Sequence, residues 1–335
     1  MCPANNTRGE IQDEGSGPLR LQVGSSIKER RVDKYLHGRF SNFSRAMIQR
    51  QIVAGGIRVN GKIVKTSYKL SPGDEIVLTL PELPGKEIEP EDIPLNIIYE
   101  DEDMIILNKQ ADMVVHPARS NTHGTLVNAL AFYSDKLSSG LGEFRPCIVH
   151  RLDRDTTGVM VVARNDMAQW KIAKQFERRQ VRKTYLAVVH GVPELTADRV
   201  SAPLGVHPRV REKYAIRPEI GKESITFYEV VESFRGFSLL KLMPQTGRTH
   251  QIRVHLSYIK HPIVADDMYG GKLVYPWQLK DLETAVEEPV ISRFALHAST
   301  LEFKHPTTEE MVKFEAPLPE DMQNLLDMLR KYRKL

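Results

Sequence analysis

The charge along this 335-residue chain changes sign abruptly, and this change constrains the fold more than any single motif. Residues 26–70, which we call the basic block, carry eleven Lys and Arg side chains against two acidic ones. Residues 82–103 carry nine Asp and Glu against one Lys, and they overlap the proline-rich stretch LPELPGKEIEPEDIP. A charge reversal at a proline-rich stretch is typical of a linker. The sequence therefore predicts two domains, with the boundaries tail 1–25, first domain 26–82, acidic linker 83–94 and second domain 95–335.

The composition places the chain among globular proteins. Apolar residues make up 41% and charged residues 27%, and no apolar run is long enough to span a bilayer. The start, MCPANNTRGEIQDEGSG, has no hydrophobic stretch and carries acidic residues, so we expect a disordered tail rather than a secretory signal. With Cys2 and Cys147 as the only cysteines, neither a disulfide framework nor a thiolate zinc cluster can form. We expect no membrane association, no metal and a cytoplasmic location.

The basic block is predicted to form a compact unit of two short helices and a hairpin. The segments RVDKYLHGRF and SRAMIQRQIVAGG are helical in pattern, and the second runs from a possible N-cap at Ser44 to a stop at Gly55 and Gly56. In IRVNGKIV, the pair Asn60 and Gly61 suits a tight hairpin turn, and SPGDEIVLTL adds another turn and strand.

The charge of this small unit has two interpretations. A run of cations is usually a solvated face, but nearly a dozen on so few residues repel one another unless a polyanion accepts them. A nucleic-acid backbone is the obvious polyanion, and we favour RNA or DNA binding. The side chains we expect to contact RNA are Arg45, Arg50, Arg58 and Lys62.

The second domain is predicted to be an α+β structure around a mostly antiparallel sheet. The segments MIILNK, GVMVVARN, KTYLAVVHG, SITFYEVVES and FSLLKLMP are rich in β-branched residues and read as strands. The segments MAQWKIAKQFERRQ and THQIRVHLSYI read as helices. Strands joined by hairpins with a few interposed helices favour this fold class. The common nucleotide-binding, metalloprotease and serine-hydrolase motifs are absent.

The nonapeptide HRLDRDTTG, residues 150–158, is the first candidate for chemistry. On a strand, Asp153 and Asp155 would lie on one face about 7 Å apart, as paired acids do in glycosidases. The segment also holds two arginines and ends in Thr-Thr-Gly, and sugar sites usually offer more aromatic platforms than this chain has. An Arg/Asp turn in which Thr156 or Thr157 caps backbone groups competes strongly with the paired-acid interpretation.

Two further segments offer polar groups. In PQTGRTHQIRVHL, Gly247 suggests a loop that carries Arg248 to a helix beginning near Thr249, where free N–H groups favour an anion. Arg248 could clamp a phosphate or a carboxylate, or simply be a surface arginine. His250 and His255 are five residues apart and so do not share a helical face, which argues against a metal site. Tyr185 lies in an apolar strand, where core packing is its ordinary role.

Taken together, these segments resemble the RluA/RluD-type pseudouridine synthase family. The resemblance rests on motifs that occur in one order: IPLNIIYEDEDMIILNKQADMVVHPA, HRLDRDTTG, KTYLAVVHG, TGRTHQIRVHL, HPIVADDMYG and RFALHASTLEFKHP. It covers residues 26–320, and the basic block resembles the small S-four RNA-binding domain that precedes the catalytic domain in many members. It implies a pseudouridine synthase fold and an RNA isomerase without a cofactor.

The resemblance also assigns roles. It implies that Asp153 is the catalytic aspartate, that Tyr185 stacks on the target uracil, and that Arg248 pairs with the aspartate. Arg151 is expected to hold the flipped nucleotide or to fill its gap, His150 to lie on the substrate side, and Asp155 to be structural. Thr157 stands where a serine is usual and Asp267 where a proline is usual.

The expected substrate is uridine in large-subunit ribosomal RNA, with transfer RNA as the alternative, and we expect a monomer. A rival from another class is a non-catalytic RNA-binding or assembly factor, which would be expected to lack the aspartate or its arginine partner. A third hypothesis is a glycosidase, which requires both Asp153 and Asp155.

Overall fold

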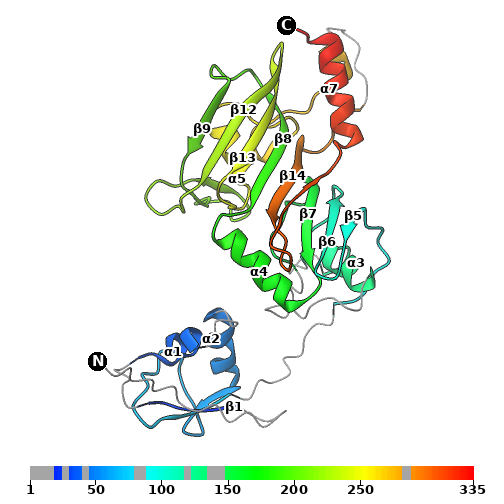
Figure 1. Ribbon diagram of the computed structural model, residues 1–335. Coiled ribbons are helices and arrows are strands. Elements are labelled where there is room, and N and C mark those ends of the chain that lie inside the picture. The colour runs from blue at the N-terminus through cyan, green and yellow to red at the C-terminus, as the bar shows by residue number, and fades with distance from the viewer. Residues whose placement is uncertain are drawn as a thin grey trace, which may run out of the picture. The chain divides into compact units, whose positions relative to one another are not determined.

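The computed structural model describes residues 19–24, 30–39, 45–78, 88–116, 122–133, 148–280 and 288–335. The chain forms two compact units, which divide between Glu87 and Ile88 (Figure 1). This division falls inside the predicted linker. The predicted tail overlaps the described residues only from position 19 onward.

The first unit packs two helices on a small antiparallel sheet. Its elements are β1 (Leu19–Gln22), α1 (Val32–Arg39), α2 (Arg45–Ala54), β2 (Ile57–Val59), β3 (Lys62–Ile63) and β4 (Glu75–Leu78), with strand order β1-β4-β2-β3. The predicted hairpin turn is present, because Asn60 and Gly61 both have positive φ, of 48° and 73°. The two predicted helices are confirmed within a residue or two at each end.

The prediction of a tail is wrong for residues 19–22. These residues form β1, which pairs antiparallel with β4, and Leu21 is buried in the core of the unit. The segment LRLQ alternates apolar and polar residues, which is the pattern of a half-buried strand. An alternating pattern of only four residues is too short to be recognised as a strand from the sequence alone.

The second unit is built on a nine-stranded sheet that is almost entirely antiparallel (Figure 1). The strand order is β5-β6-β7-β14-β8-β13-β12-β9, with β15 beside β14, and only β7 and β14 run parallel. These strands are β5 (Ile97–Glu100), β6 (Met104–Lys109), β7 (Thr157–Ala163), β8 (Arg182–His190), β9 (Ala197–Ser201), β12 (Ile225–Phe234), β13 (Phe237–Pro244), β14 (Leu296–Lys304) and β15 (Met311–Glu315). The predicted α+β class with a mostly antiparallel sheet is confirmed.

The remaining elements cover the sheet or extend from it. They are α3 (Leu126–Tyr133), α4 (Asp166–Glu177), β10 (Leu204–Val206), β11 (Tyr214–Ile216), α5 (Gln251–Tyr258), the 3-10 helix η1 (Asp267–Tyr269), α6 (Pro276–Leu279) and α7 (Glu320–Tyr332). Strands β10 and β11 form a separate two-stranded hairpin. Among the described residues, no helix is long and apolar enough to cross a membrane.

The central strands are apolar without interruption because helices cover both of their faces. Ile105 and Met160 face the side where Leu126 of α3 packs, whereas Ile106 and Val161 face the side where Ile172 of α4 packs. A strand buried on both faces loses the alternation of polar and apolar residues, as MIIL and GVMVVA do. The edge of the sheet beyond β8 is covered instead by α5 and α7, which share its largest core cluster.

The sheet aligns one residue from each of four strands in a single row. Gly158 at the start of β7 lies opposite Ala298 of β14, Ala298 lies opposite Tyr185 of β8, and Tyr185 lies opposite Leu242 of β13. The loop before β7 and the loop after β13 therefore meet beside Tyr185. These are the loops that carry HRLDRD and QTGRTH.

Candidate active site

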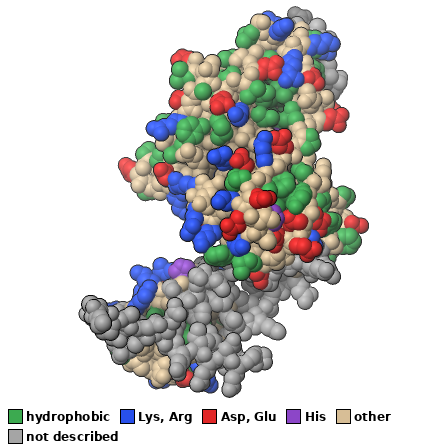
Figure 2. Space-filling view, in the orientation of Figure 1, with side chains coloured by type: hydrophobic (Ala, Val, Ile, Leu, Met, Phe, Trp, Pro, Cys, Tyr) green, Lys and Arg blue, Asp and Glu red, His purple; other side chains and the backbone are tan. Residues whose placement is uncertain are grey.

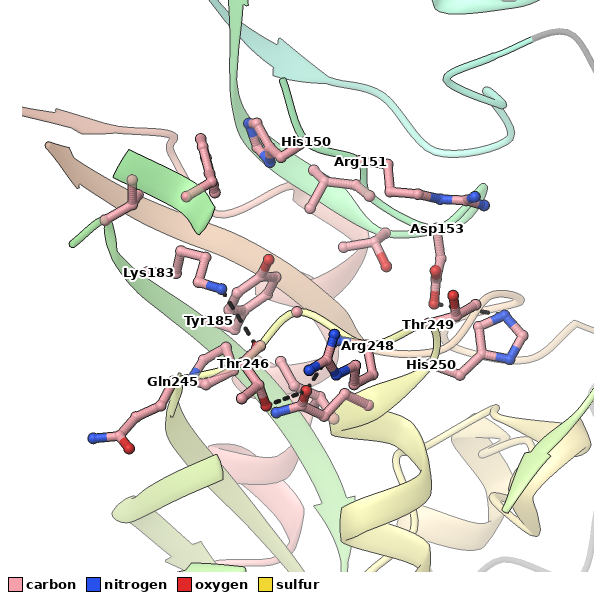
Figure 3. Close-up of a pocket in the computed structure, with 18 of the residues that line it drawn as sticks. His150, Arg151, Asp153, Lys183, Tyr185, Gln245, Thr246, Arg248, Thr249 and His250 are labelled. Carbon is pink, nitrogen blue, oxygen red and sulfur yellow. Dashed lines mark hydrogen bonds and ion pairs between the residues drawn. The ribbon is translucent and has the colours of Figure 1, made fainter. Parts of the chain in front are cut away.

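A cavity of about 480 Å3 opens at this meeting point. Three segments supply most of its walls, namely residues 149–153, alternate residues from Val181 to Tyr185 at the start of β8, and residues 244–253 (Figure 3). Of the residues predicted from sequence, His150, Arg151, Asp153, Tyr185 and Arg248 all line it. The cavity therefore joins three of the motifs that the sequence analysis singled out.

Asp153 lies in this cavity with its side chain 19% exposed. Its Oδ2 atom is 3.5 Å from Nη1 of Arg253 and 3.9 Å from Nε2 of His250. Figure 3 shows His250 beside the Asp153 carboxylate. Both neighbours approach the same oxygen, so the carboxylate has a donor side and a side open to the cavity.

Arg253 is held rigidly in the first turn of α5. Its side chain is only 6% exposed, and it forms two hydrogen bonds of 2.7 Å with Asp266, whose side chain is fully buried. The guanidinium also lies over the rings of Tyr269 and Phe294, at 4.9 and 4.1 Å from their centroids. Burial alone would lower the pKa of Arg253, but the hydrogen bonds and charge of Asp266 raise it. Arg253 is thus a fixed cation beside Asp153.

The predicted pairing of Arg248 with Asp153 is therefore wrong, because the ion pair belongs to Arg253. Arg248 lies in the loop before α5, as predicted, and the helix itself begins at Gln251 rather than near Thr249. There its Nε donates to the carbonyl oxygen of Glu223 at 3.4 Å. Arg248 still lines the cavity, between Tyr185 and Thr249 in Figure 3.

The signal for Arg253 was present in the sequence. It lies within QIRVHL, where apolar residues on both sides predict burial, and a buried arginine requires an acidic partner. That partner, Asp266, comes from the separate motif HPIVADDMYG. The pairing of the two segments could not be derived from spacing, because it depends on how η1 folds back on α5.

Hydrogen bonds of the Gln251 side chain hold the loop that carries Arg248 and His250. Its Oε1 atom accepts hydrogen bonds from the Thr246 hydroxyl at 2.7 Å and from the Arg248 N–H at 3.0 Å. Its Nε2 atom donates to the carbonyl oxygen of Ile225 and to the Thr226 hydroxyl, both at 3.0 Å. Gln251 is 4% exposed, so these bonds are protected from water. The loop is consequently preorganised.

Asp155 does not line the cavity. Its backbone oxygen accepts a hydrogen bond from Nη1 of Arg293 at 3.0 Å, and the nearby Thr156 N–H donates to the carbonyl oxygen of Asp153 at 3.1 Å. Thr157 does not cap the turn, since its hydroxyl bonds Nδ1 of the buried His297 at 2.9 Å. The segment is a turn with one carboxylate at the cavity, which does not fit the glycosidase hypothesis.

Lys109, which no sequence motif singled out, lies under this turn. Lys109 is 1% exposed, and its Nζ atom donates to the carbonyl oxygens of Gln110, Met113 and Arg154 at 2.7 to 2.8 Å. Burial lowers the pKa of Lys109 to about 7, against the opposing charges of Asp155 and Asp153. Lys109 thus ties the end of β6 to the turn that carries Asp153.

The last residue of the nonapeptide, Gly158, has to be glycine for a steric reason. Its φ is +119°, and a Cβ atom built on it would lie 2.1 Å from the carbonyl oxygen of Ala298. No side chain fits in that space. The close contact of β7 with β14 fixes where the preceding turn, and so Asp153, lies.

Tyr185 and Lys183 project from the same face of β8, two residues apart, into the cavity. Burial, followed by the charge of Asp153, raises the pKa of Tyr185, so its phenol stays protonated. Burial lowers the pKa of Lys183 to about 8. Its Nζ atom donates to the carbonyl oxygen of Thr246 at 3.4 Å. Lys183 is a second cavity cation that sequence analysis missed.

The polar and stacking contacts of His150 are made within the fold rather than in the cavity. Its Nε2 atom accepts a hydrogen bond from the Val161 N–H at 3.1 Å, and its ring stacks on Phe176 at 4.6 Å between centroids. Burial, aided by the charge of Lys183, lowers the pKa of His150 to about 3. Only the face of the ring that lines the cavity is available to contact the substrate, which is the role predicted for His150.

This burial makes the stability of the second unit sensitive to acid. The unfolded chain binds a proton at His150 near pH 6.5 and the folded chain only near pH 3, so unfolding takes up a proton between these values. The free energy of unfolding should fall as the pH drops from 6.5 to 3, by at most about 1.4 kcal/mol per pH unit from this group. Denaturant unfolding of the wild type and of His150→Gln, which can accept the same bond without titrating, measures the difference. Parallel pH profiles would contradict the assignment.

Comparison with known proteins decides the family. The family model described as RNA pseudouridylate synthase matches residues 103–258, and the S4 domain model matches residues 30–76. The chain is 40% identical to an uncharacterized RNA pseudouridine synthase of Bacillus subtilis, over 93% of this chain and 98% of the relative. It is 41% identical to the ribosomal large subunit pseudouridine synthase D of Xanthomonas campestris, over 96% and 97% respectively. The chain belongs to the RNA pseudouridine synthase family.

Members of this family are isomerases that act on RNA, so the class of enzyme predicted from sequence is confirmed. A solved structure agrees. Human RNA pseudouridylate synthase domain containing 4 superposes with a TM-score of 0.54 at 28% identity, covering 70% of this chain and 93% of that one. The pseudouridine synthase fold therefore accounts for the second unit, and the S4 domain for the first.

Within the S4 domain, Arg45 differs from the other predicted RNA contacts. It donates through Nε and Nη2 to Oδ2 of Asp33, at 3.1 and 2.9 Å. Asp33 is completely buried and also accepts bonds from Arg31 and Gln49. Burial alone would raise the pKa of Asp33, but these donors outweigh it and hold the pKa well below its usual value. Arg45 thus helps to fix α1 against α2.

All four predicted contacts are exposed, including Arg45 with 43% of its side chain accessible. Arg50 lies on α2, Arg58 on β2 and Lys62 on β3, and all three reach solvent. In the synthase unit, Figure 2 shows Lys and Arg side chains gathered on one flank, near the ends of β8 and β9 in this view. Exposed arginines of this part of the chain are Arg182 on β8 and Arg199 on β9, with Arg178 and Arg179 between α4 and β8. Both units therefore present cations to a polyanion.

Proposed function

We propose that this synthase converts uridines of large-subunit ribosomal RNA to pseudouridine, with Asp153 as its catalytic residue and without a cofactor. The observation that carries the proposal is the ion pair of Asp153 with the buried Arg253 inside a cavity shared with Tyr185. The choice of RNA is supported by relatives named ribosomal large subunit pseudouridine synthase D, including that of Escherichia coli at 39% identity over 93% of this chain.

The reaction needs no reagent beyond the substrate. The bond between the sugar carbon and the ring nitrogen breaks, the uracil turns over, and the sugar carbon bonds to a ring carbon. The proton of that ring carbon leaves and the ring nitrogen gains one, so product and substrate have the same atoms. One carboxylate suffices, either as a nucleophile or as the base that takes a proton.

The surroundings of Asp153 support the proposal of either role. Its Oδ2 atom faces Arg253 and His250, and the carboxylate borders the cavity. Because the guanidinium of Arg253 is locked by Asp266, it needs no reorganisation when charge develops at the reacting centre. Arg253 then stabilises both the carboxylate and a departing uracil anion.

The target uridine has to leave its stack to reach this cavity. Tyr185 offers an aromatic face for the uracil, and its protonated phenol carries no charge. Arg151 is exposed at the cavity rim, where it can hold the flipped nucleotide or fill the gap that it leaves. Arg248 and Lys183 add positive charge to the walls.

A groove of about 970 Å3 continues from the cavity and shares Arg179, Val181 and Lys183 with it. Its walls also include Arg182 and Arg199, together with the carboxylates of Asp198, Glu229 and Glu302. The four cations of these walls suit the phosphates of the nucleotides beside the target, against the repulsion of the three carboxylates. The groove thus extends the substrate site from one nucleotide to a short stretch of RNA.

The S4 domain should contribute affinity rather than rate. Replacing Arg50, Arg58 and Lys62 together with Gln should weaken RNA binding and reduce the slope of log K against log salt by about two to three. The turnover of bound RNA should not change, because these residues lie outside the synthase unit. Filter binding across a salt series, with single-turnover kinetics, measures both quantities.

The matched control removes three exposed cations at or near the ends of α6 and α7, namely Lys280, Lys331 and Lys334. These residues line neither the cavity nor the groove. This control variant should leave the slope of log K for RNA binding against log salt unchanged. Equal effects of the two triple variants would mean that the S4 cations form only a solvated face.

The proposed substrate is tested by pseudouridine mapping of total RNA from cells with and without the gene. Sites in large-subunit ribosomal RNA should lose pseudouridine, and the purified enzyme should restore it on the same RNA transcribed in vitro. Loss confined to transfer RNA would overturn the choice of RNA but not the reaction. Unchanged RNA of every class would overturn the activity.

A further inference from the structure

We propose that His250, held in one tautomer by Tyr269, is a positioning residue that presents a neutral N–H donor to the Asp153 carboxylate. This inference rests on the proposed function, since it concerns the residue on which that function depends. It gives a function to a short series of hydrogen bonds that links the β10–β11 hairpin, η1 and the start of α5.

This series of hydrogen bonds begins at a backbone N–H group and ends at the Asp153 carboxylate. The Tyr214 N–H donates to the phenol oxygen of Tyr269 at 2.9 Å, and this oxygen lies 2.8 Å from Nδ1 of His250. On the other side of the ring, Nε2 of His250 faces Oδ2 of Asp153 at 3.9 Å. Tyr214, Tyr269 and His250, which are distant in sequence, are thus linked to the Asp153 carboxylate through His250.

The first bond favours one direction for the second. The backbone N–H of Tyr214 can only donate, so the Tyr269 oxygen accepts there and directs its own proton elsewhere. The acceptor within reach of that phenol is Nδ1 of His250. A neutral imidazole that accepts at Nδ1 carries its proton on Nε2. The N–H of His250 thus points at Asp153.

The surroundings of His250 keep the ring in place. Its ring packs edge-on against Tyr214 and Tyr269, at 5.9 and 5.6 Å between centroids. Its side chain is 16% exposed, and burial together with the Arg253 and Arg151 cations lowers its pKa, against the charges of Asp153 and Asp266. These surroundings favour the neutral form of the ring.

The backbone of His250 is also unusual. Its φ is +55°, in the left-handed region, at the residue that precedes the first turn of α5. A non-glycine residue in this region costs free energy, and such residues are found at sites where the side chain must point in one direction. Here the conformation turns the imidazole toward the cavity while Arg253 approaches from the helix.

The consequence for Asp153 is that both donors share one oxygen. Arg253 and His250 both lie nearest to Oδ2, at 3.5 and 3.9 Å. Fixing Oδ2 from two directions restrains rotation of the carboxylate and leaves Oδ1 for the substrate. Tightening of these contacts when RNA excludes water from the cavity would complete the arrangement.

The experiment compares two amides at position 250 in the full-length enzyme. In His250→Gln the amide nitrogen reaches about as far as Nε2 and can still donate to Asp153, whereas in His250→Asn it cannot. We expect His250→Asn to lower the single-turnover rate on the order of 10- to 100-fold with little change in RNA affinity. His250→Gln should retain at least about threefold more activity than His250→Asn.

Backbone preference predicts the opposite order. Asn tolerates the left-handed region better than Gln does, so a purely structural role would make His250→Asn the more active variant. Melting temperatures and RNA affinities of both variants are measured beside the rates. Activity of His250→Asn equal to or above that of His250→Gln overturns the inference.

A double-mutant cycle tests the tautomer. Tyr269→Phe removes only the phenol oxygen, and we expect it to slow the wild type about three- to tenfold without slowing His250→Asn further. Equal effects in both backgrounds would show that Tyr269 acts independently and would overturn the inference. Should His250→Asn fail to fold, the same cycle is run on His250→Gln, where loss of the phenol is again expected to cost nothing.

Failure of this inference is distinguishable from failure of the proposed function. Asp153→Asn is measured in the same assay. If Asp153→Asn is inactive and His250→Asn is as fast as the wild type, only the role of His250 is wrong. Turnover by Asp153→Asn would remove the proposed function and this inference with it.

Discussion

Asp153→Asn is expected to abolish pseudouridine formation, with a loss of about four orders of magnitude or more. Asn has the shape of Asp and keeps an oxygen that can face Arg253, so the cavity should stay intact. Its amide is neither a nucleophile nor a proton acceptor, so both possible roles of the carboxylate are lost. Release of tritium from uridine labelled at the ring carbon, measured in single turnover, gives the rate. RNA affinity should stay within a few-fold of the wild type.

Asp155→Asn is the matched control, because it makes the same change two residues away on the turn. Asp155 contributes a backbone oxygen to Arg293, which the substitution preserves, while its charge acts on the buried Lys109. We expect a modest effect on rate or stability only. Comparable losses in both variants would favour the paired-acid chemistry of a glycosidase, and normal turnover by Asp153→Asn would remove the proposed mechanism.

The fold was predictable where local patterns are strong. The turn at Asn60 and Gly61, the helix over 166–177 and the strand over 237–244 follow from turn chemistry, helical period and β-branched content. Strand order did not follow, because the pairing of β14 between β7 and β8 joins segments more than 100 residues apart. Strand β1 was missed because four alternating residues carry too little signal.

The site was predictable in its residues but not in its pairings. Asp153, Tyr185 and Arg248 all reach one cavity, as the order of motifs implied. The partner of Asp153 was misassigned because the motif TGRTHQIR holds two arginines, and only the fold shows that Arg253 on α5, rather than Arg248 in the preceding loop, faces the carboxylate. Lys109 and Lys183 were missed because each lies in an apolar strand whose burial only the folded sheet reveals.

Arg253→Gln is expected to have the second largest effect, on both stability and rate. It leaves Asp266, which is fully buried, without its two hydrogen bonds of 2.7 Å. Removing one partner of a buried ion pair costs about 3 to 5 kcal/mol of unfolding free energy. It also removes the cation at 3.5 Å from Asp153, so the remaining folded enzyme should be slow as well.

The double variant Arg253→Gln, Asp266→Asn separates these two effects. It removes the uncompensated charge, so most of the lost stability should return, as measured by denaturant unfolding. Activity should not return with it, because no cation then faces Asp153. Recovery of turnover together with stability would show that Arg253 serves only the fold. Arg253→Lys should fall between the single and double variants in stability yet remain slow, since one ammonium cannot bind Asp266 in two places and also reach Asp153.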